Sequence, residues 1–309
     1  MRHRNLIILH DRRAHGDRDF REIAKRVRTL APDIHAFVLS EPRRRMRPFL
    51  AQFLRPTLFV QIFPVQHLPM LRGFVAGPLG SGKIRSYRLL EAAGLPVPRW
   101  VEITPETKLD PAEWGNYVIV KPDRGRRGAF IWPVKTRRVR YKPPESYPEG
   151  HYGRAGPMLA QRFIFTGPYP VSYRVLTCFG EPLLSIRYRA GQGQAPLSGP
   201  DGFSEGLRPV VASTRKAEVS LCFDADILAL ARRIHEVHPD QPVVGCDVMR
   251  DAGTGELWIA EVNMVHIWSL SSVSGVAMQA AWGLDFHGQF DAFGQAAEAM
   301  IRATRRLAR

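Results

Sequence analysis

Hydrophobic and polar residues alternate along the first eighty positions in the pattern of a small α/β unit. Short runs rich in β-branched residues at 5–10, 34–40 and 57–63 predict three strands. Between the first two strands, apolar residues recur at helical spacing through 19–30 and predict an amphipathic helix. Strands separated by helical spacers form parallel sheets, so we expect a parallel sheet covered by helices.

The rest of the chain is rich in predicted strands. A helix is predicted at 83–94, where a glycine and two prolines end it. Predicted helices at about 224–238 and 290–307 enclose a hairpin at 243–262, and the Gly- and Pro-rich stretch 191–209 is a predicted loop. Between the helix at 83–94 and that loop, six apolar runs predict strands, namely RWVEI, YVIVKP, AFIWPV, MLAQRFIF, VSYRVLTCF and PLLSIRYRA.

The length of 309 residues predicts two or three packed units. Apolar residues make up 45% of the chain, which excludes a disordered or collagen-like protein. No apolar run approaches the roughly 18 residues that span a bilayer, and the first apolar stretch is too short for a secretory signal. The widely spaced Cys178, Cys222 and Cys246 predict neither a disulfide framework nor a zinc site. We therefore expect a cytoplasmic protein without a membrane partner.

Charge adds a further constraint, because 44 basic and 29 acidic residues give a formal net charge of +15. Such an excess predicts a polyanionic partner, which is nucleic acid, an anionic surface or a phosphorylated ligand. Basic runs occur at 43–47 and 135–142. No aromatic residues interleave with the first run, so a solvated loop is favoured over a nucleic-acid contact there.

Residues 77–83, GPLGSGK, fit the GxxxxGK pattern of a phosphate-binding P-loop. Ile84 stands where a P-loop needs a Mg²⁺-binding serine or threonine, and no acidic Walker B strand follows convincingly. The favoured interpretation is a glycine-rich turn before a helix, although Lys83 remains available to a phosphate in another geometry.

The hairpin VVGCDVMR–ELWIAEVN carries acidic residues in an otherwise apolar pattern. If Arg250 pairs with Glu256 across the turn, Asp247 lies on the same face as Glu261 and Asn263. Buried carboxylates are costly unless a cation or hydrogen bonds compensate, and oxygen-only ligation suits Mg²⁺. The alternative, that Glu261 and Asn263 face solvent at a strand end, stays open on spacing alone.

The segment YVIVKPDRGRRGAFI carries Lys121 at the end of a predicted strand and a loop with Gly125 and Gly128. A lysine beside a flexible glycine loop can hold a triphosphate from two sides. An ordinary basic hairpin turn is the alternative. Together with the acidic hairpin, this segment predicts a site that combines a cation and lysines around one polyphosphate. The loop arginines that would add charge are Arg124, Arg126 and Arg127.

Taken in order from Lys83 to the C terminus, these segments resemble the ATP-grasp superfamily of carboxylate-amine ligases. The chain is distantly similar to RimK-like and D-Ala-D-Ala ligase-like enzymes. The resemblance implies an α/β (α+β) fold with a Rossmann-like pre-ATP-grasp domain before a two-lobed ATP-grasp fold. The implied bounds are 1–80 for the first domain, 81–160 for the N-terminal lobe and 161–309 for the C-terminal lobe.

The same resemblance implies roles for individual residues. Lys83 and Lys121 are similar to the two lysines that bind ATP phosphates, with Gly125 and Gly128 in the loop that covers them. AQRFIF resembles the interlobe hinge. The implied adenine contacts there are the Gln161 side chain and the backbone groups of Arg162 and Ile164.

The strand pair SYRVLTCFGEPLLSIRYRA resembles the segment that carries arginines toward the phosphate or acyl substrate. This implies a catalytic role for Arg174 together with Arg187 or Arg189. GCDVMRD and AEVN resemble the metal-binding strands, with Mg²⁺, or Mn²⁺ as a substitute. The implied metal ligands are Asp247, Glu261 and Asn263.

Some positions depart from the family pattern. Ser172 stands where an acidic residue usually binds ribose, and Gly245 stands where some dipeptide ligases carry an arginine, which argues against a D-alanine ligase. After Asn263, where many relatives have Pro-Gly, the chain places His266 and Trp268. These two line an unusual acceptor pocket or pack in the core, and packing is favoured.

The expected activity is phosphorylation of a carboxylate by ATP, followed by attack of an amine or similar nucleophile on the acyl phosphate. The expected partners are small carboxylate and amine substrates or an acidic peptide, with a homodimer as the expected assembly and nucleic acid disfavoured. Three alternatives remain. They are a non-catalytic ATP-grasp relic that binds nucleic acid through its basic surface, an ATP-grasp kinase acting on a small alcohol, and a P-loop NTPase.

Overall fold

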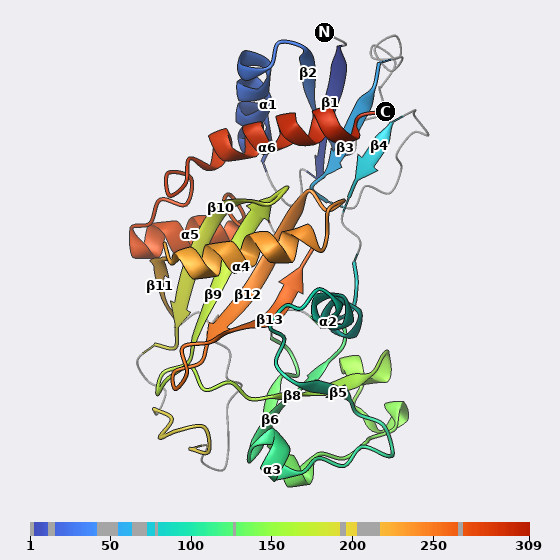
Figure 1. Ribbon diagram of the computed structural model, residues 1–309, viewed down its shortest axis with the longest axis vertical. Coiled ribbons are helices and arrows are strands. Elements are labelled where there is room, and N and C mark those ends of the chain that lie inside the picture. Colours follow the sequence, from blue (N-terminus) through green and yellow to red (C-terminus); the bar gives the residue numbers. More distant parts are fainter. Residues whose placement is uncertain are drawn as a thin grey trace.

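In the computed structural model, the described residues form three β-sheets arranged along one long axis (Figure 1). The basic run 43–47, Arg126, Arg127 and His266 lie outside the described residues. The residues that the structure describes are 3–11, 16–41, 55–63, 73–77, 80–125, 128–191, 196–202, 217–264 and 268–309.

The N-terminal sheet is parallel, as the alternation of strands and helical spacing predicts. Its strands lie in the order β2-β1-β3-β4, with every neighbouring pair parallel. Helix α1 (Arg18–Leu30) covers one face and buries its apolar stripe, including Phe20, Ile23 and Val27. The strands are β1 (Arg4–Asp11), β2 (Ile34–Glu41), β3 (Thr57–Gln61) and β4 (Phe74–Ala76).

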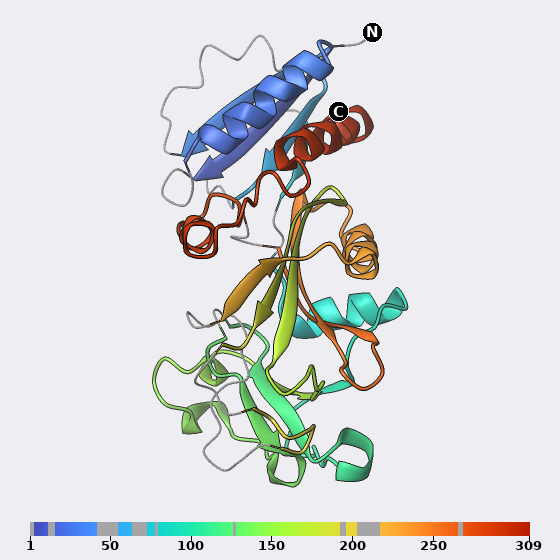
Figure 2. The ribbon, with the colours of Figure 1, turned by 90° about the vertical axis from the view of Figure 1, so that its left-hand side faces the viewer.

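The middle sheet has five strands in the order β11-β10-β9-β12-β13, and all of its pairs are antiparallel. Helices α4 and α5 lie on opposite faces of this sheet (Figure 2). The strands are β9 (Val171–Cys178), β10 (Glu181–Arg189), β11 (Glu218–Leu221), β12 (Val243–Arg250) and β13 (Leu257–Asn263), and the helices are α4 (Ala225–Glu236) and α5 (Val273–Trp282).

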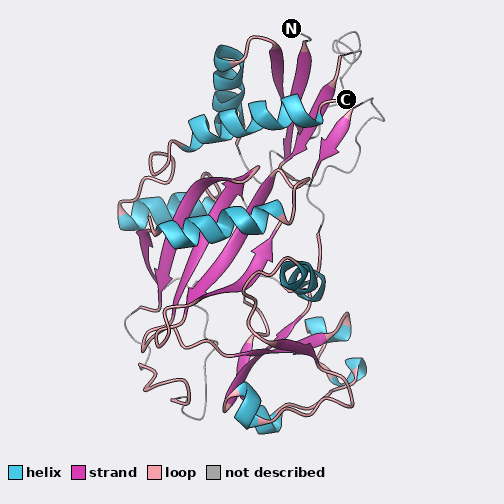
Figure 3. Cartoon of the chain, viewed as in Figure 1, coloured by secondary structure: helices cyan, strands magenta, loops and turns pink. Residues whose placement is uncertain are grey.

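The third sheet has four strands in the order β5-β8-β6-β7 (Figure 3). Its small core includes Val118, Ala160 and Trp114, the last from the short helix α3 (Pro111–Trp114). Helix α2 (Lys83–Ala92) lies between this sheet and the middle one, against β13. The strands are β5 (Trp100–Glu102), β6 (Tyr117–Pro122), β7 (Trp132–Lys135) and β8 (Met158–Arg162), with 3₁₀ turns at Thr136–Arg138, Pro144–Ser146 and Tyr152–Arg154.

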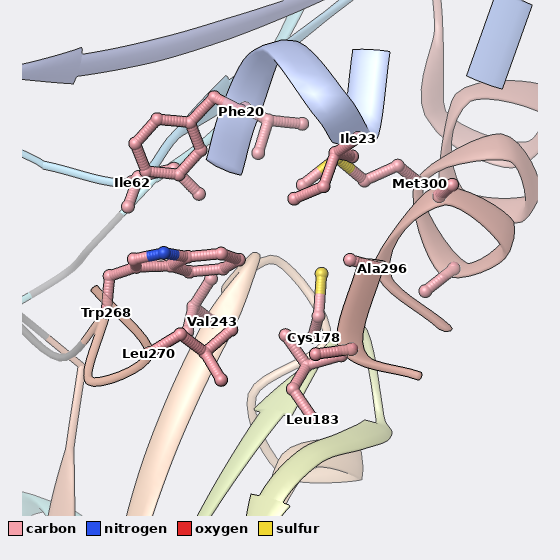
Figure 4. Packing of buried hydrophobic residues seen from close by; sticks show 14 of the residues in the cluster. Phe20, Ile23, Ile62, Cys178, Leu183, Val243, Trp268, Leu270, Ala296 and Met300 are labelled. Carbon is pink, nitrogen blue, oxygen red and sulfur yellow. The ribbon is translucent and has the colours of Figure 1, made fainter. Parts of the chain in front are cut away.

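The C-terminal helix α6 (Ala292–Leu307) returns to the N-terminal sheet and packs against α1 and β10. One apolar core therefore joins the N-terminal and middle sheets. Figure 4 shows Trp268 facing Phe20 within this core, near Ala296 and Met300 of α6. Trp268 is fully buried, its ring centroid lies 5.1 Å from that of Phe20, and its Nε1 donates to Asp19. Of the two interpretations of Trp268, the structure agrees with packing.

Among the described residues, the sequence pattern does not predict helices α3 and α5 or strand β11. Helix α5 begins at a Ser272 N-cap, whose hydroxyl accepts from the amide of Gly275, and ends at Gly283 in the left-handed region. Its low polar content hides the helical period, because neither face is distinctly polar. Strand β11 was likewise assigned to no element. The domain bounds at 80 and 160 stay predictions, and β8 spans the second of them. No helix among the described residues has the length and apolarity to cross a bilayer.

Candidate functional site

The acidic hairpin is formed by β12 and β13, but its register differs from the predicted one. Arg250 pairs with Leu257 rather than Glu256, so the connecting turn includes Glu256. The amide of Asp251 closes the turn by donating to the carbonyl of Glu256 at 2.9 Å, and the Asp251 carboxylate accepts from two amides inside it. This side-chain capping shifts the ladder by one residue, and the apolar pattern does not reveal it.

A bulge in β13 brings the predicted metal ligands together. The register shifts between Asp247 and Val248, which leaves Ala260 as the extra residue and sets Asp247 directly opposite Glu261. The side-chain nitrogen Nδ2 of Asn263 donates to the Asp247 carboxylate at 3.4 Å. Within the described residues, no three His, Cys, Asp or Glu side chains gather at a metal site, so the third oxygen here would come from an amide. Two carboxylates and one amide are a donor set that fits Mg²⁺.

Arg174 on β9 forms a bidentate ion pair with Asp247. The two residues are opposite each other in the β9–β12 ladder. Arg174 Nε and Nη2 donate to different oxygens of Asp247, each at 2.7 Å. The Asp247 carboxylate raises the pKa of Arg174 above its ordinary value. Such forked, charge-assisted pairs are the stronger class of hydrogen bonds, so Arg174 is held firmly on the acidic face.

Lys83 reaches the same hairpin from the first residue of α2. Its Nζ lies 3.1 Å from Glu261 Oε1, and only 8% of the lysine side chain is exposed. Asp123, after β6, fixes this helix end because its carboxylate accepts from the amide of Ile84 at 2.8 Å and its carbonyl accepts from the amide of Lys83 at 3.1 Å. Gly82 permits the approach, since a Cβ there would collide with the Asp123 carboxylate.

Lys121 on β6 is buried, with 5% of its surface exposed. Its Nζ donates to the Tyr87 hydroxyl and to Gln161 Oε1 at 2.7 Å each, and to the Ala260 carbonyl at 3.2 Å. Burial lowers the pKa of this ammonium to about 7, while the carboxylates of the hairpin oppose the shift. Lys121 therefore lies beside the bulge that orients the acidic residues.

Strand β8 carries the residues predicted to meet adenine. Gln161 is buried and is engaged by Lys121. The side chain of Arg162 is exposed, and its amide donates to the Arg99 carbonyl at 2.8 Å, so that amide is already used within the sheet. Ile164 is buried just after the strand. The adenine contacts of Gln161, Arg162 and Ile164 stay predictions.

Gly125 and Gly128 border the two undescribed residues of the predicted phosphate loop. Gly128 has a φ of 70°, which favours glycine because side chains with a Cβ are strained there. A Cβ on Gly125 would lie 3.0 Å from the Pro122 ring. The backbone at this point is thus suited to glycine, and the phosphate contact of the loop stays a prediction.

The structure does not bring Arg187 or Arg189 to Arg174. Successive residues of a strand face opposite sides of its sheet. Arg187 lies opposite Tyr173, which packs in the core on the α4 side, whereas Arg174 faces the other side. Arg189 pairs with Glu218 at 3.0 Å. Because β9 and β10 pair in this register, Arg187 and Arg189 lie on the face opposite Arg174, and their role toward the substrate stays a prediction.

Two residues of this cluster, Tyr87 and Asp123, were not predicted as site residues. Tyr87 was evident only as a member of the apolar face of a helix, and Asp123 as a polar residue in a basic loop. The contacts that recruit them link segments more than thirty residues apart, such as the 40 positions between Lys83 and Asp123. The cluster as a whole sets three cationic side chains near two carboxylates between the middle and third sheets, an arrangement suited to a polyphosphate and a divalent cation. The three cations are Lys83, Lys121 and Arg174.

The arrangement of the three sheets can be compared with that of proteins of known structure. No family model matches the chain. The structure of D-cycloserine synthetase DcsG aligns with a TM-score of 0.55 at 14% identity, covering 97% of this chain and 99% of that one. The ATP-grasp ligase PsnB, complexed with minimal precursor, Mg and ADP, aligns with a TM-score of 0.50 at 13% identity, covering 97% and 98%. The chain has the ATP-grasp fold.

A curated relative is similar in sequence as well. The D-alanine–D-alanine ligase of Ectopseudomonas mendocina (strain ymp) is 30% identical over 216 residues, which are 69% of this chain. The match spans 64% of the length of that enzyme.

Proposed function

We propose that the protein is an ATP- and Mg²⁺-dependent ligase that activates a carboxylate as an acyl phosphate and joins it to an amine or similar nucleophile. The observation that carries this proposal is that Lys83 pairs with Glu261, Arg174 pairs with Asp247, and Lys121 donates to the carbonyl of Ala260 beside Glu261. The three basic residues come from α2, β9 and β6. The ATP-grasp fold and the ligases among its structural relatives support the same assignment.

In this proposal, Lys83 and Lys121 bind the phosphates of ATP, and the glycine loop covers them. Asp247, Glu261 and Asn263 would hold Mg²⁺, which supplies charge neutralisation for the transferred phosphoryl group. The carboxylates are at present neutralised by Lys83 and Arg174. When the two carboxylates bind the metal instead, Lys83 would be free to bind a phosphate and Arg174 would be free to bind the substrate.

The reaction then needs positioning and charge, and no covalent nucleophile from the protein. A substrate carboxylate oxygen attacks the γ-phosphorus of ATP, and the bond to ADP breaks. The amine nitrogen next attacks the acyl carbon, phosphate leaves, and the nitrogen loses a proton. Arg174 is proposed to bind the substrate carboxylate and then its phosphate. Arg187 and Arg189 have no part in this arrangement because they face the other side of the sheet.

The substrates are proposed only by class. Small carboxylates and amines, or an acidic peptide, fit a basic protein with a carboxylate-activating site. The resemblance to D-alanine–D-alanine ligase does not extend to their identity, since the match spans 64% of that enzyme and Gly245 replaces the arginine of some dipeptide ligases.

Replacing Glu261 with glutamine tests this function. The variant keeps the shape of the side chain but removes the charge that pairs with Lys83 and would bind the metal. We expect ADP release, measured with pooled carboxylates and amines, to fall by about 100-fold or more. Thermal unfolding should stay close to that of the wild type.

Glu256→Gln is the matched control, because Glu256 is an exposed carboxylate in the turn of the same hairpin. It should leave ADP release unchanged. Undiminished turnover by Glu261→Gln would show that Glu261 does not bind the metal, and it would contradict the proposed ligase function.

A further inference from the structure

Tyr87 is a fully buried residue of α2 with no assigned role. Its hydroxyl donates to the Ala260 carbonyl at 2.5 Å and accepts from Lys121 Nζ at 2.7 Å. Its ring packs against Trp100, with centroids 5.6 Å apart. This one hydroxyl therefore connects α2, the buried lysine of β6 and the bulge of β13.

The ammonium group of Lys121 has three protons to donate. It has three acceptors, which are the Tyr87 hydroxyl and Gln161 Oε1 at 2.7 Å and the Ala260 carbonyl at 3.2 Å. All three donors are thus used inside the protein. To bind a phosphate oxygen, Lys121 must give up one of these acceptors, and the bond to Ala260 is the longest.

Giving up that bond is costly if it leaves a buried carbonyl without a donor. The Ala260 carbonyl, however, also accepts from Tyr87, and this bond is the shorter of the two. When Lys121 turns to phosphate, Tyr87 still satisfies Ala260 with its proton. Its lone pairs, with those of Gln161, continue to hold the ammonium in place.

We propose that Tyr87 is a positioning residue for ATP binding, which holds the Lys121 ammonium and takes over the Ala260 carbonyl when Lys121 engages a phosphate. This inference rests on the proposed function, because it assumes that Lys121 binds ATP. Tyr87 itself acts through Lys121 and touches no reacting atom. It also ties the position of that lysine to the strand that carries Glu261.

Tyr87→Phe removes the hydroxyl and keeps the ring that packs on Trp100. We expect the Kd for ATP, measured by calorimetry with Mg²⁺ present, to rise about tenfold, because Lys121 loses one acceptor and becomes the main donor to Ala260. The KM for ATP should rise by a similar factor, with kcat changed by less than about threefold. A role in stability alone would lower the unfolding temperature and leave the Kd unchanged, and that result, or tighter ATP binding, would overturn the proposal.

Two further variants separate this inference from the proposed function. Tyr173→Phe is the matched control, since Tyr173 belongs to the same core cluster but lies on β9, opposite Arg187 in the β9–β10 ladder, and it should bind ATP as the wild type does. Lys121→Met should weaken ATP binding strongly, and adding Tyr87→Phe to it should have no further effect on the Kd. Wild-type affinity in Lys121→Met would refute the role of the lysine. Additive losses in the double variant would refute only the role of Tyr87.

Discussion

Lys121 shows how one buried residue sets the behaviour of the site. Its ammonium is removed from water, and three oxygen acceptors replace its hydration. Burial lowers its pKa to about 7, against an ordinary value of 10.5. The lysine therefore lies near the midpoint of its titration at neutral pH, and anything that adds negative charge nearby favours the protonated form.

This pKa makes ATP binding depend on pH. The polyphosphate stabilises the ammonium, so the pKa of Lys121 rises on binding, and ATP binding is coupled to proton uptake above pH 7. We expect the Kd for ATP to be nearly constant below about pH 6.5 and to increase, by up to about tenfold per unit, above pH 7.

Lys121→Met is the control for the titration of ATP itself. This variant should bind ATP weakly, and its Kd for ATP should not show the increase above pH 7 that is due to Lys121. If log Kd for ATP changes with pH at the same slope in both proteins between pH 7 and 9, the proton taken up on binding belongs to another group.

At the scale of elements, the position of the site depends on two contacts, one within the β12–β13 hairpin and one between segments 39 residues apart. The bulge at Ala260 sets Asp247 opposite Glu261, and Asp123 fixes the start of α2 so that Lys83 reaches the hairpin. Each contact is local in space, and neither follows from hydrophobic periodicity.

Gly82→Ala tests the second contact. A Cβ at this position would collide with the Asp123 carboxylate, so the helix start must move away from β6. We expect ATP affinity to fall by about tenfold, because Lys83 is displaced. The unfolding temperature should fall by several degrees.

Gly156→Ala is the matched control, since a Cβ there has no neighbour within 4 Å. It should have little effect on either quantity. Wild-type ATP affinity in Gly82→Ala would show that the start of α2 does not position Lys83.

Much of this arrangement could be predicted from the sequence, for identifiable reasons. Helices α1, α4 and α6 have a clear apolar stripe, and the predicted ranges lie within two residues of the observed ends. The Asp247, Glu261 and Asn263 set could be found because its polar residues interrupt apolar strands. The register of β12 and β13 could not be predicted, because the Asp251 turn and the bulge add residues without changing the apolar pattern. The sequence could not show that Arg187 and Arg174 lie on opposite faces of the sheet, because the face depends on how the two strands pair.

At the scale of the whole molecule, the excess of basic charge is divided between the interior and the surface. Lys83, Lys121 and Arg174 lie at the junction of the lobes. The predicted basic run at 135–142 is exposed at most of its charged positions, including Arg137, Arg138 and Arg140, and lies in the third sheet and its 3₁₀ turn. A surface of this kind attracts acidic partners at long range. The acidic peptide remains a predicted substrate on this basis.

The arrangement of the sheets has a further consequence. Because α6 closes the core shared by the N-terminal and middle sheets, these two units are joined by a continuous apolar interface. The third sheet has its own small core. A further apolar cluster, which includes Leu159 of β8 and Val175 of β9, packs the third sheet against the middle one.

The central claim, that the site transfers the γ-phosphoryl group of ATP to a carboxylate, is tested most directly by product analysis. The purified protein is incubated with ATP, Mg²⁺ and pools of amino acids, peptides and other small carboxylates, with and without amine acceptors. We expect ADP and phosphate in equal amounts, released only when a carboxylate and an acceptor are both present, with a new amide bond detected by mass spectrometry. Formation of AMP, or of a stable phosphorylated alcohol in place of an amide, would contradict it.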